Sequence, residues 1–73
     1  MKSVSDLTKQ ELVVLGLVAQ GMRNSDIARE LVITTKTVEA HLSRIFDKLG
    51  VSSRTQAALY AIHHHLPGSE LEM

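Results

Sequence analysis

The chain has 73 residues, which is enough for one small domain and too few for a two-domain enzyme. It contains no cysteine, which excludes a disulfide framework, a thiolate nucleophile and a cysteine-held metal site. Aromatic residues make up only 3% of the chain, so the 44% hydrophobic content is mostly aliphatic and favours helices over a β-sandwich. No apolar run is long enough to span a bilayer and no signal peptide is evident, so we expect a cytoplasmic protein without a membrane partner.

The charge of the chain is balanced overall but not along its length. Eight Lys and Arg residues face eight Asp and Glu residues, for a formal net charge of zero. We expect residues 1–6 to be a leader or linker remnant, residues 7–66 the folded domain and residues 67–73 a tail. The domain then holds seven basic and five acidic residues, and this small excess predicts a modest, salt-dependent affinity of one copy for nucleic acid.

Two helices are predicted in the first half of the chain, at about residues 9–20 and 25–31. Thr8 and Glu11 match a capping box at the start of the first helix, and Asn24 suits the cap of the second. Apolar side chains recur at helical spacing in both, namely Leu12, Leu15 and Ala19 in the first and Ile27, Ala28 and Leu31 in the second.

Two more helices are predicted at about residues 35–49 and 54–65. Thr34 suits the cap of the third helix, and Ser53 with Gln56 forms a second capping-box pattern before the fourth. One apolar stripe runs along the third helix, formed by Val38, Leu42, Ile45 and Leu49. The residues expected to end the first, third and fourth helices are Gly21, Gly50 and Pro67.

The short connection between the second and third helices carries a functional signal. Only three residues, 31–33, separate the last turn of one helix from the cap of the next. Two helices joined in this way, the second one longer, form a helix-turn-helix, whose second helix can lie in the major groove of DNA. We therefore predict an all-α fold, a four-helix bundle that contains a helix-turn-helix.

The outer face of the third predicted helix carries slim side chains that a groove about 12 Å wide can accept. Glu39 can accept a hydrogen bond from a cytosine amino group, Ala40 can touch a thymine methyl and Ser43 can bond to several base edges. The other candidate DNA-binding residues lie where phosphates pass, and they are Asn24, Ser25, Thr35, Lys36, Thr37, His41, Arg44 and Lys48. A polar face is also typical of a solvated surface helix, so periodicity alone leaves both interpretations open.

Three segments carry a more specific signal than periodicity. The first is Leu7-Thr8 with Glu11, the second is Gly21 with Asn24 and Asp26-Ile27-Ala28, and the third joins Ile33-Thr34, Lys36-Thr37-Val38, His41, Lys48-Leu49-Gly50-Val51 and Ser53-Arg54-Thr55-Gln56-Ala57. Through these motifs, residues 7–62 resemble the C-terminal DNA-binding domain of the LuxR/FixJ family of bacterial transcription regulators, which includes the NarL-type response regulators.

The resemblance implies a four-helix domain whose third helix reads DNA and whose fourth commonly makes the dimer contact. By position, it implies phosphate contacts for Lys36 and Thr37 and base-facing places for Glu39, Ala40 and Ser43. The chain departs from the family pattern at Lys9 and Gln10, where many members have Pro and Arg, and it lacks the basic residues often found at positions 39 and 43. These departures leave the fold intact, but the operator sequence cannot be transferred from relatives.

The fourth predicted helix is apolar around most of its circumference. One face must pack on the domain, and an apolar face that stays exposed on a small protein marks an interface. The candidate residues for a homodimer contact are Val51, Ala58, Leu59 and Ile62. The alternative is that this helix is simply well buried.

The histidines at positions 63–65, together with His41, raise the question of a metal site. Consecutive helical residues point about 100° apart and no carboxylate stands at a suitable spacing, so we predict a solvated helix end, no metal and no cofactor. No nucleophile elbow or phosphate-binding loop is present, so we predict no enzymatic activity. Glu11 and Asp26 are explained by capping and by the positive ends of two helices.

These expectations combine into one predicted function. It is sequence-specific binding to double-stranded DNA and regulation of bacterial transcription, by a homodimer joined through the fourth helix. RNA polymerase is a further candidate partner. The alternative from another class is a protein–protein interaction module that does not bind DNA directly.

Overall fold

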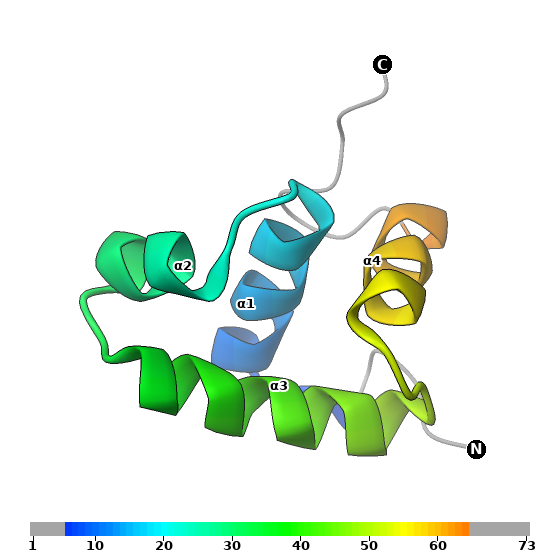
Figure 1. Ribbon diagram of the computed structural model, residues 1–73. Coiled ribbons are helices and arrows are strands. Elements are labelled where there is room, and N and C mark those ends of the chain that lie inside the picture. Colours follow the sequence, from blue (N-terminus) through cyan, green and yellow to red (C-terminus); the bar gives the residue numbers. More distant parts are fainter. Residues whose placement is uncertain (1–5, 65–73) are drawn as a thin grey trace.

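The computed structural model describes residues 6–64, and in this range the chain forms four helices and no strand (Figure 1). The helices are α1 at Lys9–Ala19, α2 at Asn24–Leu31, α3 at Thr35–Leu49 and α4 at Arg54–His63. The predicted all-α fold with a helix-turn-helix is confirmed. Residues 1–5 of the predicted leader and the whole predicted tail lie outside the described residues. Within the described part, no helix has the length and apolar character that crossing a membrane requires.

The central element of the domain is α1. It contacts each of the other three helices, while α4 packs mainly against α1 and α2 packs mainly against α3. In Figure 1, α3 crosses the lower edge of the domain, and no other helix covers its lower side. One long side of α3 is therefore open to solvent.

The core is aliphatic, as the composition predicts. The largest fully buried side chains are Val14 and Leu15 from α1, Ile27 from α2, and Val38 and Ile45 from α3. The stripe predicted along α3 is confirmed, because all four of its side chains are buried. α4 contributes Ala57 and Ala61, whose small side chains allow a short distance between helix axes.

The N-terminus of α1 is capped as predicted. Thr8 Oγ1 accepts a hydrogen bond from the Glu11 N–H at 3.1 Å, and Glu11 Oε1 accepts one from the Thr8 N–H at 3.0 Å. Leu7 and Leu12, just outside and inside this box, are buried and half-buried. The box satisfies two N–H groups that the start of a helix leaves unpaired.

The predicted cap of α2 is wrong by one residue. Asn24 is the first residue of the helix, and Arg23 is the N-cap. The Asp26 carboxylate sets this register, because it accepts a hydrogen bond from the Arg23 N–H at 3.2 Å. The side chain of Asn24 does not cap the helix, since its Oδ1 accepts a hydrogen bond from Arg54.

The start of α4 differs from the prediction in one bond. Ser53 Oγ accepts a hydrogen bond from the Gln56 N–H at 3.1 Å, as expected of a cap. The Gln56 side chain does not complete the box, because its Oε1 accepts a hydrogen bond from the Ser52 N–H at 2.8 Å. The predicted ends of α1 and α4, at about residues 20 and 65, lie one and two residues beyond the last helical residues, Ala19 and His63.

The turn between α2 and α3 contains a strained residue. Val32 has a left-handed backbone, with φ 57° and ψ 49°, and it is 88% exposed. Gly21 and Gly50 also have positive φ, as their predicted places after α1 and α3 require. A residue with a Cβ atom costs about 1–2 kcal/mol in this conformation, whereas glycine adopts it freely.

Candidate nucleic-acid interface

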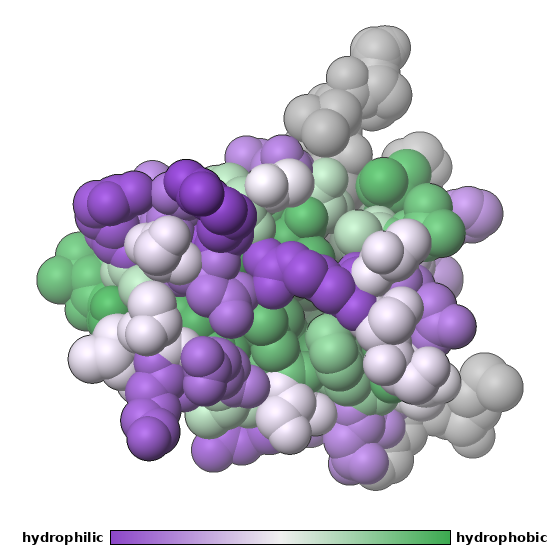
Figure 2. All heavy atoms as spheres, viewed as in Figure 1, coloured by the Kyte–Doolittle hydropathy of each residue, from purple (hydrophilic) through white to green (hydrophobic). Residues whose placement is uncertain are grey.

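The exposed side of α3 brings most of the predicted DNA contacts together on one helix. The buried stripe of α3 packs into the domain, which leaves the opposite side chains in solvent. The predicted contact residues that are exposed on α3 are Thr35, Lys36, Thr37, Glu39, Ala40, Ser43 and Arg44. Figure 2 shows mostly hydrophilic and neutral colours along this lower edge of the molecule. The surface is polar and has the width of a single helix.

The first turn of α3 is held by its predicted cap. Thr34 Oγ1 accepts a hydrogen bond from the Thr37 N–H at 3.1 Å and lies 3.0 Å from the Thr37 hydroxyl. Lys36 stands in the same turn with an exposed side chain. A lysine and the positive end of a helix both attract a phosphate, so this turn is electrostatically suited to the DNA backbone.

The predicted base readers follow along α3. Glu39, Ala40 and Ser43 are all exposed. Glu39 and Ser43 are four positions apart, which places them one above the other on the same side of the helix. A carboxylate acceptor and a hydroxyl at this spacing can face neighbouring base pairs in a major groove.

His41 is turned partly into the domain. The residue is half-buried, and its Nδ1 atom is buried without a hydrogen-bond partner among residues 6–64. It also lies near enough to Glu11 for its charge to help lower the pKa of that carboxyl group. This degree of burial is typical of a histidine that packs beside the core. A side chain that contacts DNA is expected to be more exposed.

Lys48 has a structural partner that its place in the sequence does not predict. Its Nζ lies 2.8 Å from Oε1 of Glu11, and Glu11 is only 2% exposed. Burial alone would raise the pKa of Glu11, but the hydrogen bonds from Lys48 and the Thr8 N–H, with the charge of Lys48, hold that pKa below its usual value. Glu11 therefore stays ionised, and Lys48 joins α3 to α1 instead of standing free for a phosphate.

A family model and several relatives match this arrangement of helices in sequence. The model described as "Bacterial regulatory proteins, luxR family" matches residues 5–61, which is most of the chain. The chain belongs to the luxR family. It is a domain of the kind that serves DNA-binding regulation of transcription.

The relatives of this luxR-family chain are longer proteins. The transcriptional regulatory protein LiaR of Bacillus subtilis is 55% identical over 60 residues, which are 82% of this chain and 28% of that protein. The response regulator protein VraR of Staphylococcus aureus is 48% identical over 60 residues, 82% of this chain and 29% of that protein, and the VraR of Staphylococcus epidermidis gives the same values. The chain thus spans less than a third of the length of these relatives.

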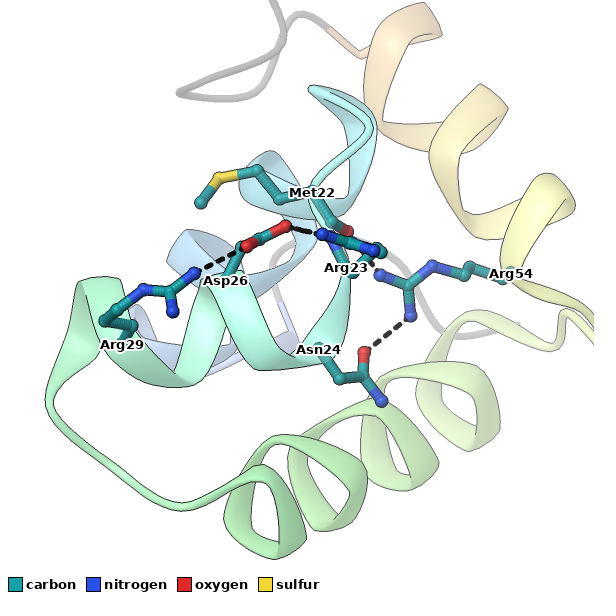
Figure 3. A network of polar contacts seen from close by, with 6 residues as sticks. All are labelled: Met22, Arg23, Asn24, Asp26, Arg29 and Arg54. Carbon is teal, nitrogen blue, oxygen red and sulfur yellow. Dashed lines mark hydrogen bonds and ion pairs between the residues drawn. The ribbon is translucent and has the colours of Figure 1, made fainter.

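The two predicted contacts at the start of α2 in this luxR-family domain differ in their surroundings. Ser25 is exposed, whereas Asn24 is half-buried. The Nη1 atom of Arg54 donates a hydrogen bond to Asn24 Oδ1 at 2.7 Å, and its Nη2 atom donates one to the Met22 carbonyl at 2.6 Å (Figure 3). Ser25 is thus accessible to a phosphate, while the side-chain oxygen of Asn24 is bound within the domain.

The partners of Arg54 and Lys48 are too distant in the sequence for local patterns to predict them. The partners of Arg54 lie 30 and 32 residues away, and Glu11 lies 37 residues from Lys48. Helical periodicity reports on neighbours within a few turns, so it cannot detect such pairs. The only signal was that both residues belong to motifs shared with the luxR family.

The four residues predicted to make the dimer contact differ in solvent exposure. Leu59 and Ile62 are 52% and 41% exposed, whereas Val51 and Ala58 are half-buried. The alternative of a simply well-buried helix therefore does not hold for the outer face of α4. A shallow groove of about 360 Å³ lies on this face, lined by Val51, Gln56, Leu59, Tyr60, His63 and His64. Figure 2 shows hydrophobic side chains at the upper end of α4 and neutral or hydrophilic ones along its lower part.

The histidines near the end of α4 belong to the same face. The rings of Tyr60 and His64 stack with centroids 4.2 Å apart, and His63 lines the groove. Among residues 6–64, no three side chains of the types that bind metals lie grouped as ligands. His65 lies outside the described residues.

Proposed function

We propose that this chain binds double-stranded DNA sequence-specifically as a homodimer, with α3 in the major groove, and regulates transcription from the bound site. The observation that carries the proposal is the uncovered side of α3, where slim polar side chains are exposed while the opposite side is fixed in the core. A rigid helix with such a face is what direct readout of base edges requires.

Backbone contacts position the domain on the duplex. In this proposal they come from the exposed residues at the start of α2 and along α3, which are Ser25, Thr35, Lys36, Thr37 and Arg44. Asn24 adds its amide NH₂ group, and His41 and Lys48 act mainly through the packing of α3. Contacts of this kind fix the register of the protein but carry no sequence information.

Sequence is read by the exposed residues in the middle of α3. Glu39 accepts a hydrogen bond from a cytosine amino group, Ala40 packs on a thymine methyl and Ser43 bonds to a base edge. None of the three side chains can make the two-pronged contact that arginine or asparagine makes with one base. The sequence selectivity of one copy at its half-site is therefore modest, and sequence-specific binding needs a second copy.

The second copy docks on the outer face of α4. Leu59 and Ile62 are two of the three large hydrophobic side chains that are exposed among the described residues. A two-fold arrangement covers this face on both copies at once. The two copies of α3 then enter successive major grooves, about 34–36 Å apart.

The proposal also places the chain in a wider setting. The domain acts in the cytoplasm, where it reaches DNA, and RNA polymerase is its candidate protein partner. We assign it no catalytic activity and no cofactor, because its family is one of regulators and its exposed polar side chains are explained by DNA contacts.

The test is selection from a randomised pool of duplexes at low salt, with sequencing of the retained DNA and repetition of the titration at higher salt. We expect a two-fold symmetric motif and an affinity that falls steeply with salt. Absence of retained DNA at low salt and high protein concentration would overturn the role of α3. The interaction-module alternative would then explain the apolar face of α4.

A further inference from the structure

Arg54, the first residue of α4, reaches across the domain to the start of α2 (Figure 3). Its two terminal nitrogens donate to Asn24 Oδ1 and to the Met22 carbonyl, at 2.7 and 2.6 Å. Met22 lies in the loop between α1 and α2, and Asn24 opens α2. One guanidinium group therefore binds both the α1–α2 loop and the first residue of α2. Its hydrogen bonds are roughly twice as strong as those between neutral groups.

The bridge joins α2 and α4, two helices that pack mainly on different neighbours. α4 packs mainly against α1, whereas α2 packs mainly against α3. Arg54 ties α4 directly to α2 and so to the helix that faces DNA. Because a guanidinium is planar and its donors point in fixed directions, it restrains the angle between the two elements as well as their distance.

The acceptors of Arg54 are neutral groups. The carboxylate of Asp26, two residues after Asn24, is engaged by the Arg23 N–H and by Arg29, whose Nη2 lies 2.8 Å from Asp26 Oδ1. Among the described residues, no ion pair involves Arg54 itself. An arginine that bonds to a backbone carbonyl and an amide contributes geometry more than charge neutralisation.

We propose that Arg54 is a positioning residue that fixes the angle between the dimer face on α4 and the α2–α3 unit, and thereby sets the half-site spacing that the dimer accepts. This inference rests on the proposed function, since it needs two copies joined through α4. A change in this angle displaces both copies of α3 relative to the two-fold axis. Half-site spacing responds to such a displacement, while recognition within one half-site does not.

The experiment compares the unaltered chain with Arg54→Lys, which keeps the charge and loses the two-donor geometry. Binding is measured to duplexes that carry the selected half-sites at the preferred spacing and at spacings changed by one and two base pairs. Arg29→Lys is the matched control, because Arg29 pairs within α2 and its side chain is 76% exposed. Affinity for a single half-site, dimer formation and helical content are measured for every variant.

We expect Arg54→Lys to reduce the preference for the best spacing by about tenfold, the effect of losing one charge-assisted hydrogen bond. Helical content is expected to stay unchanged, and single-half-site affinity is expected to fall much less than the spacing preference, because Asn24, which Arg54 holds, is one of several proposed backbone contacts. Arg29→Lys is expected to keep the parent profile. If Arg54→Lys does not fold, Arg54→Gln, which retains one amide donor, takes its place with the same expectation.

An unchanged spacing profile in a folded variant at position 54 would overturn the inference. Unfolding of both variants would also overturn it, because Arg54 would then serve the stability of the domain as a whole. Failure of the proposed function is seen separately, as the absence of a symmetric motif for the unaltered chain, and the inference falls with it.

Discussion

Lys36 is an exposed cation in the first turn of α3, where a phosphate is expected to pass. With alanine in its place, each copy of the protein releases one counterion fewer from the DNA when it binds. We expect Lys36→Ala to weaken binding to all sequences alike and to reduce the slope of log affinity against log salt by about one unit per copy. The measurement is a salt titration with the selected duplex and with an unrelated one.

Lys9→Ala is the control for this change. Lys9 is also exposed, but it opens α1, outside the helix-turn-helix, and its removal lowers the net charge by the same amount. A salt slope that changes equally in both variants would show that only total charge matters. Loss of affinity for the selected sequence alone would instead make Lys36 a base reader.

Val32 is a second residue whose substitution has a calculable effect. Its backbone is left-handed although it carries a β-branched side chain, and at 88% exposure the side chain buries little area. Asparagine tolerates this conformation better than valine. We expect Val32→Asn to increase the free energy of unfolding by about 1 kcal/mol, or about 4–8 °C in Tm for a domain of this size.

Urea and thermal denaturation check this expectation. Val32→Thr is the matched control, because threonine keeps the β-branched shape and the strain. It is expected to leave the free energy of unfolding unchanged within about 0.5 kcal/mol, as exposed substitutions usually do. A Val32→Asn protein no more stable than the threonine variant would show that the left-handed backbone stores no strain here.

At the scale of single helices, the sequence predicts where elements lie better than how their ends are bonded. The caps Thr8 and Thr34 and the buried stripe of α3 are local patterns, and the structure confirms them. Asn24 was a poor predictor of a cap, because Arg54 competes for its side-chain oxygen from another helix. Such competition depends on the packing of the helices, which short-range patterns do not contain.

The pair of Glu11 and Lys48 links α1 to α3, and its strength depends on pH. The pKa of Glu11 is lower in the folded domain than in the unfolded chain, so the unfolded chain binds more protons as pH falls. The stabilisation is therefore complete above the unfolded-state pKa of a glutamate and is lost as pH falls through the folded-state value. We expect the free energy of unfolding to decrease across this acid range.

Lys48→Met tests the origin of that decrease. Methionine keeps the aliphatic stem and removes the ammonium group. The buried carboxylate of Glu11 then keeps one hydrogen-bond donor, the Thr8 N–H. We expect a loss of about 1.5–3 kcal/mol at neutral pH, typical of a hydrogen bond to a charged group, and a smaller difference from the parent in acid. Urea denaturation at a series of pH values from neutral to acidic measures the free energy of unfolding of the parent and the variant, and so both differences. Lys9→Met is the control. A constant difference at every pH would contradict the role of the ion pair.

For the molecule as a whole, the proposed dimer depends on the face that α4 presents to solvent. The sequence of α4 is apolar around most of its circumference, so the pattern supplied candidates for the exposed face, Leu59 and Ile62 among them, but left open whether that face is buried. The structure shows that Ala57 and Ala61 are buried while Leu59 and Ile62 are exposed. Small alanines face α1 and the larger residues face outward, which is the reverse of what burying the most apolar area in one copy would favour.

That exposed face leads to the last prediction. Leu59→Asp places a charge in the centre of the proposed dimer contact, where a second copy would have to desolvate it. We expect the variant to bind a two-half-site duplex as a monomer, with affinity reduced about 100-fold because the gain from linking two binding events is lost. Helical content is expected to stay unchanged, since Leu59 is 52% exposed.

Sedimentation of the protein with a two-half-site duplex and with a single half-site measures this effect. Val32→Asp is the matched control, because it introduces the same charge at another exposed hydrophobic residue, which lies in the turn between α2 and α3 and not on α4. It is expected to keep the stoichiometry of two copies per duplex. If Leu59→Asp also binds as two copies, the copies do not meet through α4, and the apolar face of that helix serves a different partner.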